Sequence, residues 1–390
     1  MTRLSAPWLS ASGLVQVFSV LEAAGHAAFA VGGCVRDTLL GLPVKDIDIA
    51  TDATPDRVED LMEGAGLRTV PTGKEHGTIT VIAGGESYEL TTFRRDVSTD
   101  GRRAKVAFAG TMAEDAARRD LTLNALYADA RGMVHDPLGG LPDLEARRVR
   151  FIGDPTARIR EDYLRILRFF RFSARFSSEI DAEGLAAVAA EQDGLGILAA
   201  ERVTQELTAL LALADPGRAI AAMGQTGILS RLLPGADPTH LPAVIHLEAQ
   251  AGLPPSWRRR LTTLGGSRDG LRLSKADMAE LDRQERALSE ARPAAARTYL
   301  HGAEAAWTAA LMEAAILATP LPPTLGDEIA RGAAQTFPLR AMDLPEHLEG
   351  PAIGQALKAL EAYWIKTDFA ASPSALVAHG EAIRWGADHG

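Results

Sequence analysis

The chain has 390 residues, of which 46% are hydrophobic and 24% charged, a length that suits two or three domains with separate cores. Cys34 is the only cysteine, which excludes an intramolecular disulfide and suits a reducing compartment. We find no run of 18 apolar residues and no basic-then-apolar signal pattern at the N-terminus. We therefore expect a cytoplasmic protein without a membrane segment.

Charge is distributed unevenly along the chain. The formal net charge is −10, yet residues 94–175 carry 17 Lys and Arg against 12 Asp and Glu. The flanking regions are acidic, so positive charge is concentrated in the middle of the chain. This distribution favours a phosphate-bearing ligand or a nucleic acid in that region.

The predicted elements change character near Asp115. The N-terminal part alternates short helices and strands, and we expect helices at 12–25, 34–40 and from Thr54 onward, with strands at 28–31, 46–50, 78–82 and 88–93. The polar, glycine-containing segment 94–105 indicates a mobile loop. From Asp115 onward the pattern is largely helical, with proline-containing breaks near 234–242, 253–255 and 319–323.

Two aspartates stand two residues apart in the strand expected at 46–50. Alternation along a strand would place Asp46 and Asp48 on one face and send Ile47 and Ile49 to the core. Adjacent carboxylates stay ionised only beside a cation, and Mg²⁺ takes one or two carboxylates together with water and substrate phosphates. The alternative is a solvated acidic loop.

A glycine pair precedes these aspartates. Gly32 and Gly33 allow the backbone to approach a ligand closely, and the helix expected at 34–40 would point its N-terminus at phosphate oxygens. Arg36 adds a bidentate donor for a triphosphate. The pattern is neither GxGxxG nor a Walker A loop, because Gly73-Lys74 is followed by Glu75.

These motifs occur in an order typical of one family. GGCVRD (32–37) and KDIDI (45–49) are followed by EHGTITV (75–81), YELTTFRRD (88–96), RRDLTLNAL (118–126), DPLGGLPDL (136–144) and REDYLRILRFFRFSARF (160–176). The series resembles the class II nucleotidyltransferases of the polymerase β superfamily, which include CCA-adding enzymes and bacterial poly(A) polymerases. Beyond Phe176 the resemblance is limited to a helical pattern with ERVTQEL (201–207).

The resemblance implies an α+β fold. A nucleotidyltransferase head with a mixed sheet would occupy residues 1–143, a helical neck with the base-recognition region 144–234, and a helical body and tail 235–390. It also implies addition of C, C and A to the 3′ end of tRNA from CTP and ATP, with Mg²⁺ as cofactor. No pattern in the sequence sets an oligomeric state.

The family also implies roles for individual residues. Asp46 and Asp48 would hold two metal ions, and Glu89 would supply a third catalytic carboxylate, unless it forms a surface ion pair. Arg119 matches an arginine that contacts the nucleotide, the alternative being an ion pair with Asp115 or Asp120. The counterpart of segment 94–105 is a flexible loop needed to change specificity from C to A.

The segment 161–171 suggests how nucleotides are chosen without a template. We expect one helix that carries Asp162, Arg165, Arg168 and Arg171 at every third position, with Glu161 fixing Arg165 as an i,i+4 partner. Cytosine and adenine each present an amino donor beside a ring-nitrogen acceptor, which suits Asp162 with Arg165. Uracil and guanine would leave buried charges unpaired. Arg168 and Arg171 would support nucleotide and RNA; an ordinary surface helix is the alternative.

Three other functions remain open from the sequence. A poly(A) polymerase of the same family is the first, although Glu75-His76-Gly77-Thr78 resembles the CCA-adding form of that segment. Addition of only C or only A is the second. A non-catalytic regulator that binds nucleotide or RNA is the third, and the intact pair Asp46 and Asp48 disfavours it.

Overall fold

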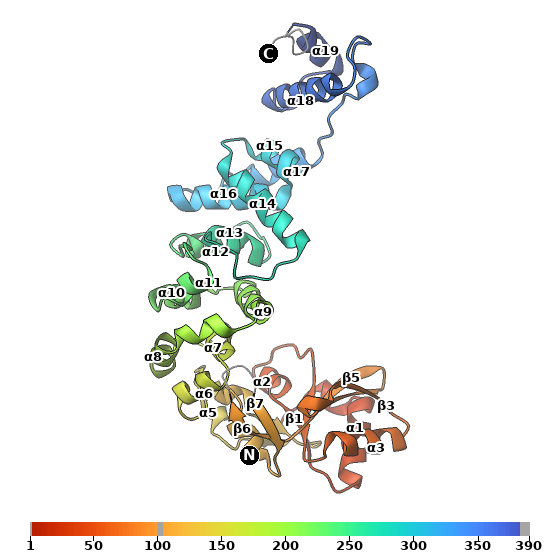
Figure 1. The fold of residues 1–390 in the computed structure, drawn as a ribbon, viewed down its shortest axis with the longest axis vertical. Helices are drawn as coiled ribbons and strands as arrows, with labels where there is room; N and C mark the ends of the chain where they lie inside the picture. The colour runs from red at the N-terminus through yellow and green to blue at the C-terminus, as the bar shows by residue number, and fades with distance from the viewer. Residues whose placement is uncertain (1, 100–103, 383–390) are drawn as a thin grey trace. The chain divides into compact units, whose positions relative to one another are not determined.

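The computed structural model describes residues 2–99 and 104–382. Packing within the chain defines two compact units: unit 1 comprises residues 1–236 and 267–272, and unit 2 comprises residues 237–266 and 273–390. Figure 1 identifies the elements of each. Within the described part of the chain, no helix is both long and apolar enough to cross a membrane.

Unit 1 contains a seven-stranded mixed sheet. Its strand order is β3-β4-β5-β2-β1-β8-β9. The strands are β1 (Ala28–Val31), β2 (Asp48–Thr51), β3 (Arg68–Gly73), β4 (Thr78–Ala83), β5 (Glu86–Thr92), β8 (Tyr127–Ala128) and β9 (Val134–His135). β2 and β5 run parallel, whereas the other neighbouring strands are antiparallel. The mixed sheet expected for the head is confirmed.

Two helices pack on this sheet near β3 and β4, as Figure 1 shows for α1 (Ser12–Ala23) and α3 (Pro55–Gly64). The sequence accounts for both positions. Thr54 caps α3 by accepting a hydrogen bond from the backbone N–H of Arg57, and Pro55 occupies the first turn. Gly13 lets α1 approach closely, since a Cβ there would lie 2.3 Å from the carbonyl oxygen of Ala83.

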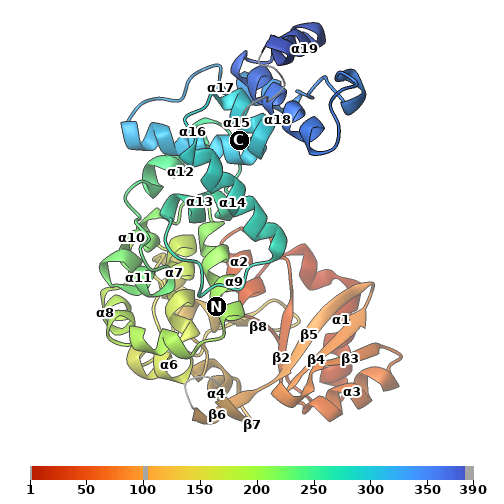
Figure 2. The ribbon, with the colours of Figure 1, turned by 45° about the horizontal axis from the view of Figure 1, so that its top comes forward.

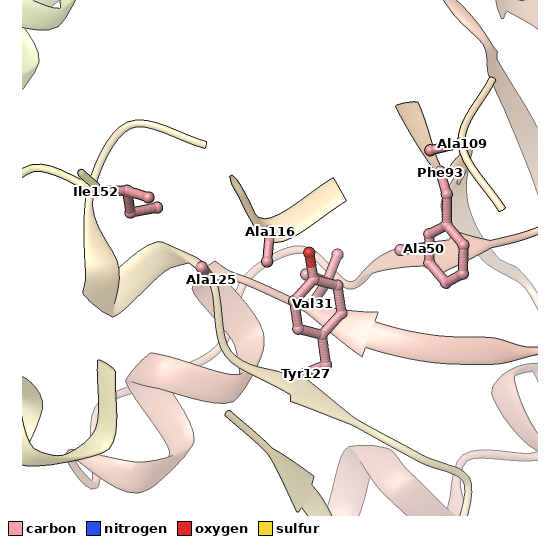
Figure 3. Packing of buried hydrophobic residues seen from close by; sticks show 8 residues of the cluster. All are labelled: Val31, Ala50, Phe93, Ala109, Ala116, Ala125, Tyr127 and Ile152. Carbon is pink, nitrogen blue, oxygen red and sulfur yellow. The ribbon is translucent and has the colours of Figure 1, made fainter. Parts of the chain in front are cut away.

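A small core joins the sheet to α4 (Met112–Ala117). Val31 of β1 and Ala50 of β2 pack with Ala116 and Tyr127, as Figure 3 shows. Tyr127 is fully buried, although its hydroxyl is polar. A buried hydroxyl requires a hydrogen-bond partner, so this core also fixes a polar contact.

The rest of unit 1 is mainly helical. It contains α2 (Gly33–Leu39), α5 (Gly140–Glu145), α6 (Pro155–Glu161), α7 (Leu164–Phe176), α8 (Ala182–Ala190), α9 (Ala200–Leu211), α10 (Gly217–Gln225) and α11 (Ile228–Leu232), with the 3₁₀ helices η1 (Pro7–Ser10), η2 (Lys74–His76), η3 (Thr122–Asn124) and η4 (Gln192–Ile197). α7 buries Phe169, Phe170, Phe172 and Phe176 and carries its arginines between them. That amphipathic pattern positions several charged groups along one helix.

Unit 2 is helical throughout its described residues. It comprises α12 (Leu241–Gln250), α13 (Trp257–Leu264), α14 (Lys275–Ser289), α15 (Ala294–His301), α16 (Ala303–Leu317), α17 (Leu325–Ala333), α18 (Pro351–Lys366) and α19 (Pro373–Ala382), with η5 (Ala341–Asp343). In Figure 2, α12, α13 and α14 lie beside α16. Glu248 of α12 is buried between Arg259 and Arg260 of α13.

Two of the segments that differ from the sequence prediction are the expected loop 94–105 and strand β3. The loop expected at 94–105 is largely a hairpin, β6 (Arg94–Thr99) and β7 (Ala104–Phe108), while residues 100–103 of that prediction lie outside the described chain. The segment was predicted as a loop because most of its residues are polar, although it also contains valine, threonine and phenylalanine residues that favour strands. β3, at the edge of the sheet, was not predicted either, because its sequence contains Pro71 and has little apolar alternation.

Candidate active site

Two carboxylates face each other where β2 and β5 run side by side. Asp48 is the register partner of Glu89, which matches the expectation that Glu89 comes from a neighbouring strand. Loss of hydration within the concave site, most of all, and the charges of Glu89 and Asp46 raise the pKa of Asp48, although Arg119 opposes them and the Asp48 side chain itself is exposed. Mutual repulsion of this kind is relieved by a bound cation.

Asp46 lies just outside the strand. β2 begins at Asp48, two residues later than expected, because its partner β1 ends at Val31 and the chain turns at Gly32. Asp46 is exposed in the preceding loop, and Ile47 is only half-buried, whereas Ile49 is in the core as expected. The carboxylate pair set by sheet geometry is therefore Asp48 with Glu89. Asp46 lies in a loop outside the pocket's lining, although its charge acts on Asp48.

The carboxylates open into a pocket of about 370 Å³ within unit 1. Its lining is strongly polar and comprises Val31, Asp48, Thr78, Glu89, Thr91, Arg94, Arg118, Arg119, Asp120, Asn124, Asp162, Arg165 and Arg168. Acidic groups and five arginines thus share one concave surface. Such a surface can hold a metal ion and an anionic ligand together.

A larger pocket, of about 540 Å³, lies near the N-terminus and the loop before β2. Its lining is mainly apolar, with Trp8, Pro7 and Pro43 among its members, and Lys45 and Glu86 are its charged residues. Convergent polar groups mark a reactive site better than volume does. We therefore place the active site in the smaller pocket.

Gly32 brings the backbone close to the pocket. Its φ is +72°, and a Cβ there would lie 3.6 Å from Nη1 of Arg119 and 3.4 Å from the carbonyl oxygen of Asn124. A side chain at this position would be strained by the positive φ and would come into contact with Arg119. Gly33 follows as the first residue of α2, and an added Cβ would lie 3.8 Å from Nη2 of Arg36.

Arg36, which we predict to donate to the triphosphate, lies outside the pocket's lining. It is 5% exposed; its guanidinium donates to Asp37 at 2.7 Å and to Oδ1 of Asn124 at 2.5 Å. The same group stacks over the ring of Phe176. With its donors engaged below the surface, Arg36 supports Asn124, which does line the pocket.

The single helix expected at 161–171 is interrupted at Asp162. α6 ends at Glu161, Asp162 is extended with φ −155°, and α7 starts at Leu164. Oδ1 of Asp162 accepts a hydrogen bond from the backbone N–H of Leu164 at 3.1 Å, the turn that an aspartate forms two residues onward. The break nevertheless leaves Asp162 in the pocket lining beside Arg165 and Arg168.

The side chain of Arg165 is tightly held. As expected, Glu161 accepts from its Nη1 at 2.5 Å, and the carbonyl oxygens of Arg158 and Arg118 accept from its guanidinium at 3.0 and 2.9 Å. Asp162 has its own partner, Arg202 of α9, at 2.7 Å. Both groups therefore keep a fixed orientation in the pocket.

Arg168 and Arg171, the last two arginines of the series, have different surroundings. Arg168 lines the pocket and donates to Asp120 at 2.6 Å. Arg171 lies outside the lining and pairs with Glu206 of α9 at 2.6 Å. Asp162, Arg165 and Arg168 of the predicted set thus line the pocket, whereas Arg171 ties α7 to α9.

Several pocket residues were not assigned roles from the sequence. Arg94, Arg118, Asp120 and Asn124 all line it. Three of them fall in the RRDLTLNAL motif, so the motif itself was a signal that side chains next to Arg119 share its environment. Arg94 belongs to another motif of the series, YELTTFRRD, although the polar residues that follow it favour a loop.

Comparison with known proteins supports this location. A family model described as the poly A polymerase head domain matches residues 28–150, and one described as a probable RNA and SrmB-binding site of polymerase A matches residues 179–239. All but three of the thirteen pocket residues fall within the first match.

Curated relatives match the first part of the chain. The CCA-adding enzyme of Bacillus pumilus is 42% identical over 229 residues, covering 58% of this chain and 56% of that protein. The CCA-adding enzyme of Levilactobacillus brevis is 40% identical over 255 residues, covering 64% and 63%. Human mitochondrial CCA tRNA nucleotidyltransferase 1 is 41% identical over 207 residues, covering 52% and 48%. The matches thus span about half to under two thirds of these relatives' length.

Solved structures match over nearly the whole chain. The Bacillus stearothermophilus CCA-adding enzyme in complex with CTP has a TM-score of 0.72 and 25% identity, covering 98% of this chain and all of that one. The Thermotoga maritima CCA-adding enzyme complexed with tRNA has the same fold, with a TM-score of 0.66 at 20% identity, covering 92% and 94%. Residues 28–150 thus match a poly A polymerase head domain, and the chain shares its fold with solved CCA-adding enzymes.

Proposed function

We propose that the protein adds C, C and A in turn to the 3′ end of tRNA, using CTP and ATP and releasing pyrophosphate. The observation that carries the proposal is a single pocket in which Asp48 and Glu89 face Arg119 and the pair Asp162 and Arg165. A nucleoside triphosphate has three parts with matching needs: a metal-bound phosphate, further anionic oxygens and a base edge. Names of the matched relatives support the same reaction.

The carboxylates fit Mg²⁺. No group of three or more His, Cys, Asp or Glu side chains among the described residues is arranged to hold a metal ion. Mg²⁺ needs fewer protein ligands than that, because substrate phosphates and water complete its octahedron. Asp48 and Asp46 would hold the metal, with Glu89 as the neighbouring carboxylate. When bound, the metal would activate the attacking hydroxyl and stabilise the leaving pyrophosphate.

The triphosphate would lie against Gly32, Gly33 and Arg119. Gly32 is buried and lies against Arg119, a fixed cation that lines the pocket. A guanidinium held in this way binds phosphate oxygens with little loss of side-chain entropy. Arg168 adds a second positive charge on the α7 side of the pocket.

Asp162 and Arg165 would select the base. The carboxylate accepts from the exocyclic amino group of cytosine or adenine, and the guanidinium donates to the adjacent ring nitrogen. Because Arg202 and Glu161 hold these two groups in place, a base with reversed donor and acceptor cannot induce them to rearrange cheaply. Uracil and guanine are thereby rejected.

We assign tRNA binding to the helical part that follows the head. The matched RNA-binding model covers residues 179–239, and the Thermotoga maritima relative is described as complexed with tRNA. RNA duplexes are recognised mainly by shape and backbone phosphates, which needs no short sequence motif. A cytoplasmic location also belongs to the proposal, on the ground that Cys34 is the only cysteine.

The test is an extension assay with Mg²⁺. The purified protein is incubated with tRNA transcripts that end before CCA, after C or after CC, each with labelled CTP, ATP, UTP or GTP. We expect two C residues and then one A. Continued A addition would indicate a poly(A) polymerase, incorporation of one nucleotide type a partial enzyme, and no incorporation a non-catalytic binder.

A further inference from the structure

A buried carboxylate that the proposed reaction does not use lies directly behind the pocket. Asp115 of α4 is 1% exposed and is outside the pocket's lining. A buried charge is costly unless it is paired and hydrogen-bonded. Its partners therefore indicate why it is there.

Asp115 is surrounded by donors that lead into the pocket. Oδ2 accepts from Nη2 and Nε of Arg119 at 2.9 and 3.2 Å, and Oδ1 accepts from Nε of Arg118 at 2.9 Å. Oδ1 also lies 3.3 Å from the backbone N–H of Arg94, the first residue of β6. One carboxylate thus contacts three residues that line the pocket.

Tyr127 completes the arrangement from β8. Its hydroxyl donates to Oδ2 of Asp115 at 2.8 Å and accepts from Nε of Arg119 at 3.1 Å. The ring is fully buried in the core shown in Figure 3, next to Val31 and Ala116. The hydroxyl therefore cannot leave the site without disturbing that core.

The same contacts reach the base-selecting side of the pocket. The carbonyl oxygen of Arg118 accepts from Nη2 of Arg165 at 2.9 Å, so the backbone next to Arg119 also holds the base-reading arginine. A shift of Arg118 would move that acceptor. The ends of the pocket are thus linked through α4.

We propose that Asp115 and Tyr127 are positioning residues for the triphosphate: they fix Arg119, and through it the phosphate side of the pocket, without touching substrate. The proposal rests on the proposed function, since it concerns the same nucleotide. An arginine restrained by a carboxylate and a hydroxyl is already ordered before the ligand arrives. Preorganised charge of this kind binds more tightly than a mobile side chain.

The experiment compares CTP and CMP binding by isothermal titration in the presence of Mg²⁺. Asp115→Asn keeps the shape of the side chain but removes its charge, and Tyr127→Phe removes only the hydroxyl. Asp143→Asn is the matched control: Asp143 is 0% exposed and accepts from Thr122, Arg148 and Arg150, but it lies outside the pocket.

The affinity ratio of CTP to CMP isolates the contribution of the β- and γ-phosphates, because CMP keeps the base, the ribose and the α-phosphate. We expect Asp115→Asn to lower this ratio by at least about 10-fold while CMP affinity stays within about 2-fold, and Tyr127→Phe to lower it by a smaller factor. The control should leave the ratio unchanged, because a merely structural defect weakens both ligands alike. An unchanged ratio in Asp115→Asn overturns the proposal.

A variant that binds neither CTP nor CMP would give no affinity ratio, so a second criterion is needed. If Asp115→Asn binds neither ligand, Tyr127→Phe decides: a lowered ratio supports positioning, and an unchanged ratio overturns it. Extension of tRNA by the wild-type protein is measured in parallel. Failure of that extension contradicts the proposed function, whereas normal extension with an unchanged ratio contradicts only the positioning role.

Discussion

Asp48 is the residue on which the proposed chemistry depends most directly. We expect Asp48→Ala to lower single-turnover CTP transfer by more than about 100-fold, since loss of even an outer-sphere partner of a metal ligand costs 10–100-fold. The fold should persist, because removing this charge relieves its repulsion by Glu89. Glu86→Ala is the control, because Glu86 is exposed at the start of β5, the strand that carries Glu89. Near-normal transfer by Asp48→Ala would contradict the metal role.

Asp162 makes a prediction about specificity rather than rate. Asp162→Ala removes the acceptor for the exocyclic amino group, while Arg165 still has a donor for a carbonyl oxygen. The preference for CTP over UTP in kcat/KM should fall by roughly 10–150-fold, the effect of losing a hydrogen bond to a charged group.

The control for this change is Glu191→Ala. Glu191 pairs with Arg160 of α6 at 2.7 Å and lies outside the pocket's lining. Glu191→Ala therefore tests whether loss of any ion pair near α6 lowers the preference for CTP over UTP. An unchanged CTP preference in Asp162→Ala would place base selection elsewhere.

The two family arginines show the limit of reading residues from sequence. Arg36 and Arg119 looked alike as phosphate donors, yet Arg36 is enclosed by Asp37, Asn124 and the ring of Phe176. Phe176 is 140 positions away in sequence, so that enclosure depends on tertiary packing. Arg119 reaches the pocket because Asp115 and Tyr127 hold it there.

At the scale of elements, the hairpin β6–β7 offers a separate test. Replacing its outer part with a short turn should spare C addition and remove A addition if this segment resets the pocket between nucleotides. Arg94 and Phe108, which pair at its base, should be kept, since Arg94 also contacts Asp115 and the carbonyl oxygen of His76. Equal loss of both additions, measured on tRNA ending before CCA and after CC, would contradict the role.

The contact between α7 and the head predicts a pH effect. Although burial opposes it, the charge of Arg168 and its hydrogen bond lower the pKa of Asp120 to about 2. A depressed carboxyl pKa stabilises the fold above the unfolded value near 3.8, and this contribution is lost as pH falls through 2. Asp120→Asn should therefore cost about 2 kcal/mol at pH 5.

Urea unfolding from pH 5 down to pH 2 measures this contribution. The gap between wild type and Asp120→Asn should narrow continuously as pH falls. A gap that is constant over this range would mean that the ion pair with Arg168 does not stabilise the fold through the charge of Asp120.

Local signals predicted most elements but missed one break. The N-cap at Thr54 and the alternation from Thr78 to Ala83 are short-range features, and the corresponding α3 and β4 were predicted. The interruption at Asp162 was not, because the helical spacing of the arginines continues across it. The side chain of Asp162 accepts a hydrogen bond from the N–H of Leu164, and this bond competes with continuation of the helix. The spacing of residues in the sequence does not reveal such a bond.

For the whole molecule, sequence indicated an α+β head and a helical remainder, and both are present. The active-site motifs lie within the first 176 residues, all in unit 1. Unit 2 gave no site prediction, because none of the motifs quoted from the sequence falls in it. Its most distinctive feature, the charge cluster of Glu248 with Arg259 and Arg260, arises from packing of α12 against α13.

That cluster allows the independence of the two units to be tested. Arg259 and Arg260 are each 1% exposed, so Glu248→Gln leaves two buried guanidinium groups without their shared carboxylate. Breaking a buried ion pair from one side costs about 3–5 kcal/mol. We expect unit 2 to unfold at a lower temperature while unit 1 keeps its transition and its CTP affinity.

Scanning calorimetry and CTP titration measure these two properties, and Glu346→Gln, at an exposed glutamate of unit 2, is the control. Loss of affinity for tRNA near the unit 2 transition, with CTP binding retained, would show that unit 2 contributes to tRNA binding. A single transition that shifts as a whole, with CTP binding lost alongside it, would instead mean that the two units fold cooperatively.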